Sequence, residues 1–172
     1  GLVIRGIFLG RASEIHWFLY GLKRVFPEAW RNFVSVLPEN ERVDILENFR
    51  RRLLDPDPSV YLPAARAWSR YEGACSTLHP SPETVSAFSN DSTAVALARI
   101  ETHYFSNGNF MPDNVLLENI EKCNGLPCLI IQGRYDMICP ISTADELHRA
   151  WPSSEIKIIP NAVSYTHLRA HE

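Results

Sequence analysis

One carboxylate stands directly after an apolar stretch that is typical of a buried strand. Asp136 follows the run CLII at 128–131 and the Gly133 that closes it, within the segment QGRYDMICP. In an open parallel sheet, reacting groups and ligands gather at the carboxyl ends of the strands, so this position suits an acid that does chemistry. Asp is also common in turns and at helix starts, so from position alone the catalytic and the structural interpretation both stay open.

The other side chains that could do chemistry do not form a recognisable motif. His16, His79, His103 and His148 show neither His-Glu-x-x-His nor a tight ligand cluster, so we expect no metal. The 8 glycines contain no Gly-x-Gly, so we also expect no nucleotide cofactor. The four cysteines form no Cys-x-x-Cys pair, and a domain of this size does not need disulfides, which favours free thiols in a reducing cytoplasm.

The elements that would position Asp136 follow from changes in hydrophobic period. PCLIIQG predicts a buried strand, 142–151 a helix with Ser142 and Asp145 spaced as a capping box, and 155–160 a second strand. Strand, helix and strand in this order predict a right-handed βαβ unit. Residues 1–9 predict another strand, which begins without a leading turn, as a truncated chain would. Residues 13–123 read as several short helices, separated by prolines at 27, 38, 56, 58, 80, 82 and 112.

Composition limits the class of protein. With 172 residues and 45% hydrophobic content, the chain can form one ordinary core. A net charge of −3 gives no reason to expect nucleic acid or an anionic membrane as a partner, and the run RRR at 50–52 is typical of a solvated helix face. No run approaches the roughly 18 apolar residues of a membrane span. The start of the chain lacks the basic flank and cleavage site of a signal peptide.

Several segments together resemble one enzyme family. IQGRYDMICP, LHRAWP and IKIIPNA resemble the C-terminal part of proline iminopeptidases, which are serine peptidases of the α/β-hydrolase fold. LVIRGIFL, EIHWF, AARAWSRYEGACSTL and ARIETHYFSNGNF resemble the strand after the nucleophile and the helical cap. The resemblance implies a partial parallel α/β-hydrolase sheet with an inserted helical cap. It assigns residues 1–12 to a sheet strand, 13–123 to the cap, 124–162 to the C-terminal βαβ unit and 163–172 to a tail outside the family.

The resemblance assigns Asp136 to the acid of a Ser-His-Asp triad, the group that orients the histidine and stabilises its charged form. The other two members are missing from the expected places. No Gly-x-Ser-x-Gly nucleophile elbow occurs in the chain. Where the family continues PNA with Gly-His, this chain has Val163 and Ser164. The tail VSYTHLRAHE looks like adaptor read-through joined to a coding sequence, so its His167 and His171 are poor candidates for the base.

Two glutamates carry the substrate chemistry that the resemblance implies. An aminopeptidase must bind a free α-ammonium group, and a cation in an apolar pocket needs carboxylates. By resemblance, Glu72 and Glu101 are these amine-binding groups, and each interrupts an otherwise apolar helical face. On residue type alone, surface ion pairs with Arg70 or Arg99 are the commoner arrangement.

A proline ring needs a flat apolar slot, which aromatic side chains supply. Phe105 lies four residues after Glu101, hence on the same face if the helix persists. Phe8 and Phe18 stand at positions that the family uses for the same pocket, although the family often has Tyr at the place of Phe18. For all three, core packing is the commoner role of the residue type.

These observations predict a fragment of a serine aminopeptidase whose parent releases N-terminal proline from peptides, through an acyl-enzyme. The fragment itself should be inactive, and its oligomeric state stays open. Two alternatives remain. Another capped α/β-hydrolase, such as an epoxide hydrolase or an esterase, would share the strand and Asp136 but would not need the two glutamates. A non-catalytic binding module would have lost its nucleophile during evolution.

Overall fold

The computed structural model describes residues 1–164, which fall into two compact units. The sheet unit comprises Gly1–Leu9, Ser76–His79 and the described chain from Asn114 onward. The helical unit comprises Gly10–Cys75 and Pro80–Asp113.

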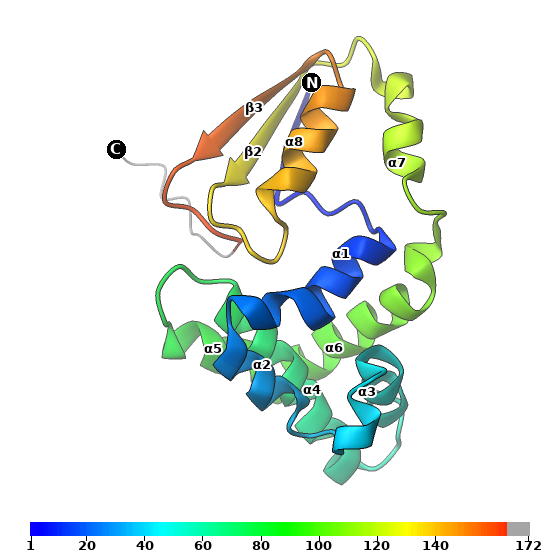
Figure 1. The fold of residues 1–172 in the computed structure, drawn as a ribbon, viewed down its shortest axis with the longest axis vertical. Coiled ribbons are helices and arrows are strands. Elements are labelled where there is room, and N and C mark those ends of the chain that lie inside the picture. Colours follow the sequence, from blue (N-terminus) through cyan, green and yellow to red (C-terminus); the bar gives the residue numbers. More distant parts are fainter. Residues whose placement is uncertain (165–172) are drawn as a thin grey trace. The chain divides into compact units, whose positions relative to one another are not determined.

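The sheet unit is built on three parallel strands (Figure 1). They are β1 (Leu2–Arg5), β2 (Cys128–Gly133) and β3 (Ser154–Ile159), in the order β1-β2-β3. The register pairs Leu2 with Cys128 on one side of β2, and Cys128 with Ser154 on the other. Helix α8 (Ile141–Ala150) connects β2 to β3, as parallel neighbours require a crossover. The predicted α/β class with a parallel sheet is confirmed, and so are the strands predicted from PCLIIQG and at 155–160.

The core of the sheet unit lies between the sheet and its helices. Side chains of β2 alternate between buried and half-buried, and Ile130 at its centre is fully buried. Ile7, Leu147 and Trp151 belong to the same cluster. Two short helices pack against it through Leu117, Ile120 and Cys123; they are α7 (Val115–Glu118) and η5 (Ile120–Cys123).

Two local predictions need correction. The first strand ends at Arg5 rather than at residue 9, because Gly6 turns the chain with a φ of +58° that other residues rarely adopt. The capping box is also wrong. Helix α8 begins at Ile141 after an extended Pro140, no side chain caps it, and Asp145 pairs instead with Arg149 one turn later at 3.0 Å.

Gly133 is the last residue of β2, and the backbone of Ala162 passes very close to it. A Cβ added there would lie 2.5 Å from the carbonyl oxygen of Ala162 and 2.7 Å from its carbonyl carbon. The amide of Tyr135 donates to the same Ala162 oxygen at 3.0 Å, so the segment after β3 is held against the exit of β2. Only glycine leaves room for this crossing.

We expect Gly133→Ala to lower the free energy of unfolding by about 1–3 kcal/mol, because the obstructing atoms belong to the backbone and cannot rotate away. Urea denaturation of the two proteins, followed by circular dichroism, measures the difference. Gly125→Ala is a useful comparison, because it separates a strained backbone from a steric clash. The φ of Gly125 is +86°, but a Cβ there would meet no atom within 4 Å. A stability of Gly133→Ala equal to that of the unsubstituted chain would show that the segment at Ala162 moves freely.

The helical unit contains the remaining elements. In chain order they are α1 (Ala12–His16), η1 (Trp17–Gly21), η2 (Leu22–Arg24), α2 (Pro27–Val34), η3 (Glu39–Glu41), α3 (Ile45–Leu53), α4 (Pro58–Cys75), α5 (Pro82–Phe88), α6 (Asp91–Ser106) and η4 (Gly108–Phe110). The long helices α4 and α6 pack against each other, and α2, α3 and α5 surround them. Aromatic rings fill the centre: Phe33 stacks on Phe49 at 4.6 Å and on Tyr71 at 4.4 Å. Trp68 meets both phenylalanines edge-on.

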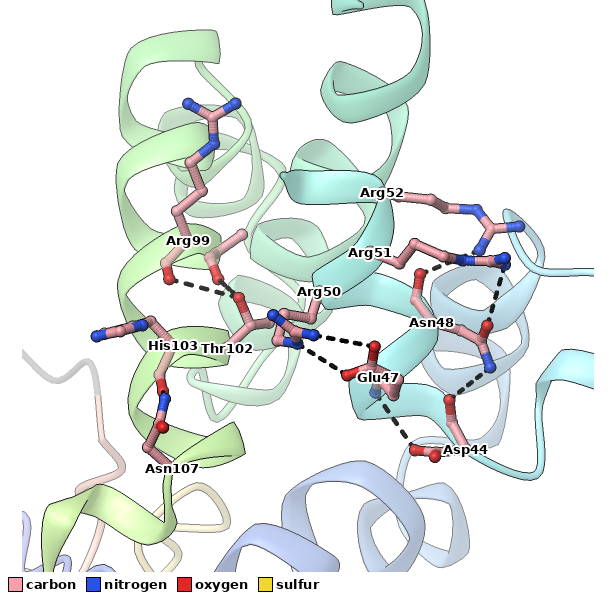
Figure 2. A network of polar contacts seen from close by, with 11 residues as sticks. Asp44, Glu47, Asn48, Arg50, Arg51, Arg52, Arg99, Thr102, His103 and Asn107 are labelled. Carbon is pink, nitrogen blue, oxygen red and sulfur yellow. Dashed lines mark hydrogen bonds and ion pairs between the residues drawn. The ribbon is translucent and has the colours of Figure 1, made fainter. Parts of the chain in front are cut away.

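The arginine run 50–52 lies on α3, and its side chains form ion pairs with nearby acids (Figure 2). Asp44 caps the helix by accepting the Glu47 amide, and Arg50 pairs with Glu47 at 2.8 Å. Arg51 and Arg52 pair with Glu41. The pKa of the exposed Glu47 lies below its usual range, chiefly because Arg50 donates to it. The run therefore forms local surface pairs.

Within residues 1–164, no helix has the length and apolar character that a bilayer crossing requires. The same residues contain no group of three side chains placed to hold a metal ion. All four cysteines are free.

Candidate active site

Asp136 lies three residues after β2, at the carboxyl end of the strand and 4% exposed. Because β1 runs parallel to β2, the carboxyl end of β1 lies at the same edge of the sheet. The position of Asp136 is therefore as predicted. Its Oδ1 accepts the amide of Cys139 at 2.8 Å, so the aspartate also shapes the turn that leads toward α8. This hydrogen bond supports the structural interpretation, in which the Asp136 side chain stabilises a turn.

A fully buried glutamine supports this turn. Gln132 Nε2 donates to the carbonyl of Cys139 at 2.8 Å and reaches Asp136 Oδ2 at 3.5 Å. Its Oε1 accepts the amide of Ile7 at 3.3 Å, which connects β2 to the segment after β1. The Gln132 side chain therefore connects the turn at Cys139 to the segment after β1.

A pocket of about 230 Å³ opens beside Asp136. Its lining comes from three strand exits and includes Arg5, Gly133, Asp136 and Ser164. The Ser164 hydroxyl donates to the Asp136 carboxylate. Burial raises the pKa of Asp136, and the hydrogen bonds from Cys139, Ile138, Ser164 and Gln132 oppose this rise without cancelling it.

In the helical unit, the two predicted glutamates lie together. Glu72 is near the end of α4 and Glu101 is on α6, and both are half-buried. Each of the two carboxyl groups acts on the pKa of the other. The indole Nε1 of Trp68 donates to Glu101 Oε2 at 2.6 Å. The helical packing therefore brings together two acids that are 29 positions apart in the sequence.

Aromatic rings stand around this acid pair. Helix α6 continues to Ser106, so Phe105 lies one turn beyond Glu101, as expected. The rings of Phe18 and Phe105 are each in contact range of Trp68, with centroids at 5.5 Å and 6.3 Å, and they meet each other edge-on at 6.3 Å. Phe18 is 6% exposed, and its carbonyl accepts the hydroxyl of Tyr71 at 3.0 Å. An acid pair beside flat apolar rings can bind an ammonium group that is attached to a small ring.

Arg70 and Arg99, the two arginines expected to pair with the glutamates, form hydrogen bonds with other groups. Arg70 Nε donates to the hydroxyl of Ser89 at 3.2 Å. Arg99 Nε donates to the carbonyl of Leu53 at 2.8 Å, and its guanidinium lies over the ring of Tyr61. The surface ion pairs that residue type alone favours are therefore not the arrangement adopted.

The chain is similar in sequence to several proteins named proline iminopeptidase. It is 42% identical to a proline iminopeptidase of Xylella fastidiosa over 163 residues, which make up 94% of this chain and 52% of that protein. A probable proline iminopeptidase of Leptolyngbya boryana is 44% identical over 164 residues, 94% of the chain and 51% of the relative. The proline iminopeptidase of Arabidopsis thaliana is 43% identical over 165 residues, 94% of the chain and 43% of the relative. Over 94% of its length, the chain is therefore similar in sequence to proline iminopeptidases.

The chain spans about half the length of the curated proline iminopeptidases that it matches. No family model matches it. The three parallel strands in one open sheet agree with a partial α/β-hydrolase fold, which confirms the predicted class.

The predicted site residues are divided between the two units. Glu72, Glu101, Phe18 and Phe105 form one cluster in the helical unit. Asp136 belongs to the sheet unit, as does Phe8, which is 39% exposed and follows the Gly6 turn. His167 and His171 lie outside the described residues.

Three residues near the proposed groups had no recognised signal in the sequence. Trp68 donates to Glu101, a contact that no local pattern predicts. Gln132 is a polar residue inside a buried strand, and this position is the signal that could have found it. Ser164 departs from the family pattern, and its hydroxyl donates to Asp136.

The acid pair makes stability depend on pH. Burial and the negative charge of Glu101 raise the pKa of Glu72 well above its usual range, and burial also raises the pKa of Glu101. The folded chain therefore holds a proton that the unfolded chain releases, so this stability is complete below the unfolded pKa and is lost as pH rises through the folded pKa.

We expect Glu72→Gln to be more stable than the unsubstituted chain at neutral pH, because the amide needs no proton to stay neutral. The advantage should widen as pH is raised from 5 to 8 and vanish near pH 4. Urea denaturation across this range measures it, with the exposed Glu155→Gln as a control that should show no such trend. A difference between Glu72→Gln and the unsubstituted chain that stays constant with pH would contradict the raised pKa.

Proposed function

We propose that this chain contributes the acid of a catalytic triad and an amine-binding cap to a serine aminopeptidase that releases N-terminal proline from peptides. The observation that carries this proposal is the Glu72–Glu101 pair beside Phe18 and Phe105. An N-terminal proline is a ring with a charged nitrogen, and this cluster offers carboxylates for the charge and rings for the apolar face. The family name of the relatives supports the same substrate.

In the proposed division of labour, Asp136 orients a histidine and stabilises its charged form, while Glu72 and Glu101 hold the substrate nitrogen. Phe105, Phe18 and Phe8 are proposed to bound the ring. The helices between the first and second strands would supply the amine-binding residues. The proposal includes no metal or cofactor, and no nucleic acid or membrane as a partner.

The serine nucleophile and the histidine base would come from sequence that this chain does not contain. No Gly-x-Ser-x-Gly occurs in it, and Ser164 stands where the family resemblance expects the histidine. Asp136 cannot replace either group, because an aspartate with no histidine to orient neither attacks an amide nor takes a proton from a serine. We therefore propose that the 172-residue chain alone is inactive.

A chimera tests this function. It joins residues 1–162 to the remaining segments of the Xanthomonas citri proline iminopeptidase, which is 43% identical to the chain over 161 residues. We expect the chimera to hydrolyse a proline arylamide and the 172-residue chain to show none of this activity. Inhibitor-sensitive turnover by the chain alone would overturn the division of labour, because one of its own residues would then have to be the nucleophile.

A blocked substrate distinguishes the alternatives. An epoxide hydrolase or esterase has no use for a substrate ammonium group, so a chimera with that specificity would act equally on proline arylamide and on its N-acetyl derivative. The proposed aminopeptidase should act on the first alone. A chimera that folds but binds proline amide without hydrolysing any substrate would favour the binding-module alternative.

A further inference from the structure

A π-turn interrupts the helical chain at one of the residues proposed to bound the substrate ring. The turn is η1, and Phe18 is its second residue. The amide of Leu22 donates to the carbonyl of Trp17, five residues earlier, whereas in an α-helix it would donate to the carbonyl of Phe18. Turns of this kind are rare and often lie at functional sites. The backbone at Phe18 therefore has a conformation that its surroundings must stabilise.

Two side chains donate to the carbonyls of this π-turn. The hydroxyl of Tyr71, on α4, donates to the carbonyl of Phe18 at 3.0 Å in a buried contact. The indole Nε1 of Trp30, on α2, donates to the carbonyl of Leu19 at 2.8 Å. In an α-helix these carbonyls would accept the amides four residues later, so a side-chain donor at each of them favours the π-turn over the regular helix.

Gly21 makes room for the turn. A Cβ at Gly21 would lie 2.9 Å from Cδ2 of the Trp17 ring, so a larger residue would push this ring away. The glycine permits the π-turn, and the donors on α2 and α4 hold it.

Tyr71 is itself firmly placed. It is 2% exposed, and its ring stacks on Phe33 with centroids 4.4 Å apart and an interplanar angle of 6°. Burial raises the pKa of its hydroxyl, so the group remains a donor at neutral pH. The ring of Phe18 packs on the rings of Tyr71 and Trp68, with centroids at 5.3 Å and 5.5 Å. Tyr71 therefore holds Phe18 at its carbonyl and at its ring.

We propose that Tyr71 is a specificity-determining positioning residue, which keeps the π-turn at 17–21 and thereby fixes the ring of Phe18. Phe18 and Phe105 meet edge-on at 6.3 Å, so the position of Phe18 sets the room left for a substrate ring beside them. The consequence is a preference for a five-membered over a six-membered cyclic amine. Tyr71 acts through Phe18 in this scheme and does not touch the substrate. The inference rests on the ring-binding and amine-binding role proposed above.

The π-turn can be observed in the 172-residue chain without any ligand. NMR couplings across hydrogen bonds identify the carbonyl that accepts the Leu22 amide. We expect Trp17 in the unsubstituted chain and Phe18 in Tyr71→Phe, because the helix regains its regular pairing once the hydroxyl is lost. A coupling to Trp17 that persists in Tyr71→Phe would overturn the role of Tyr71. A coupling to Phe18 in the unsubstituted chain would overturn the inference without any variant.

Ligand selectivity tests the consequence. Titration calorimetry compares proline amide with its six-membered homologue, piperidine-2-carboxamide. One extra methylene in an apolar pocket costs about 10- to 200-fold, so the unsubstituted chain should bind proline amide at least about tenfold more tightly. In Tyr71→Phe we expect this ratio to fall to about threefold or less, because Phe18 is no longer fixed. Tyr61→Phe is the matched control on α4, where the ring lies under the Arg99 guanidinium, and should keep the ratio.

The outcomes separate this inference from the proposed function. A general loss of stability weakens the binding of both amides equally and leaves their ratio unchanged. An unchanged ratio in folded Tyr71→Phe would therefore overturn the inference and leave the amine site standing. A folded, unsubstituted chain that binds neither amide would overturn the proposed amine site, and the inference with it.

Discussion

Replacing Asp136 by Asn in the active chimera should lower kcat for a proline arylamide by about 10⁴-fold, the loss seen when a triad aspartate becomes an amide elsewhere. The amide occupies the same volume and can still accept the Cys139 amide, so the loop should remain folded. It carries no charge to stabilise an imidazolium and favours the wrong tautomer of the histidine. Steady-state kinetics, with circular dichroism as a check on the fold, measure the effect.

Asp145→Asn is the matched control for this substitution. Asp145 belongs to the same unit and pairs with Arg149 on the surface of α8, where the side chains are 55% and 71% exposed. An exposed pair contributes about 0–1 kcal/mol to stability, and nothing in the proposed mechanism uses it. We expect kcat within about twofold of the parent chimera, since a pair this weak cannot move the reaction centre. An Asp136→Asn chimera that keeps most of its activity would show that Asp136 only shapes the turn.

Replacing Glu101 by Gln in the same chimera should lower kcat/KM for the proline arylamide by about 30- to 4000-fold. This range corresponds to about 2–5 kcal/mol, the usual cost of removing one partner of a buried charge pair. Glu101 accepts a hydrogen bond from Trp68, which favours its charged form, so the substitution removes that charge from the proposed amine site. The measurement compares hydrolysis of the proline arylamide with that of a simple acyl ester that has no amine.

The ester decides between a binding role and a structural role for Glu101. Ester hydrolysis needs the triad but no ammonium site, so the Glu101→Gln chimera should retain it. Equal losses on both substrates would mean that the substitution disturbs the packing of α4 against α6, which would assign Glu101 to the core rather than to substrate binding.

The sequence by itself determined the elements whose signals are local. The run PCLIIQG, the helix after it and the strand at 155–160 each have a hydrophobic period that can be read within a few residues, so β2, α8 and β3 were predicted nearly to their ends. The same signals placed Asp136 at the carboxyl end of a strand. The local rules failed where backbone geometry decided, as at Gly6, which ends β1 early, and at Pro140, which starts α8 without a side-chain cap.

The tertiary structure alone decided which polar groups meet. Trp68 and Glu101 are 33 residues apart, and Ile7 and Gln132 are 125 apart, so no periodicity connects them. The residue types suggested surface pairs of the glutamates with Arg70 and Arg99. Packing of α4 against α6 instead placed the two acids together, in surroundings that raise the pKa of both. A hydrogen bond or a pKa depends on distance and burial in space, and these exist only once the helices have packed.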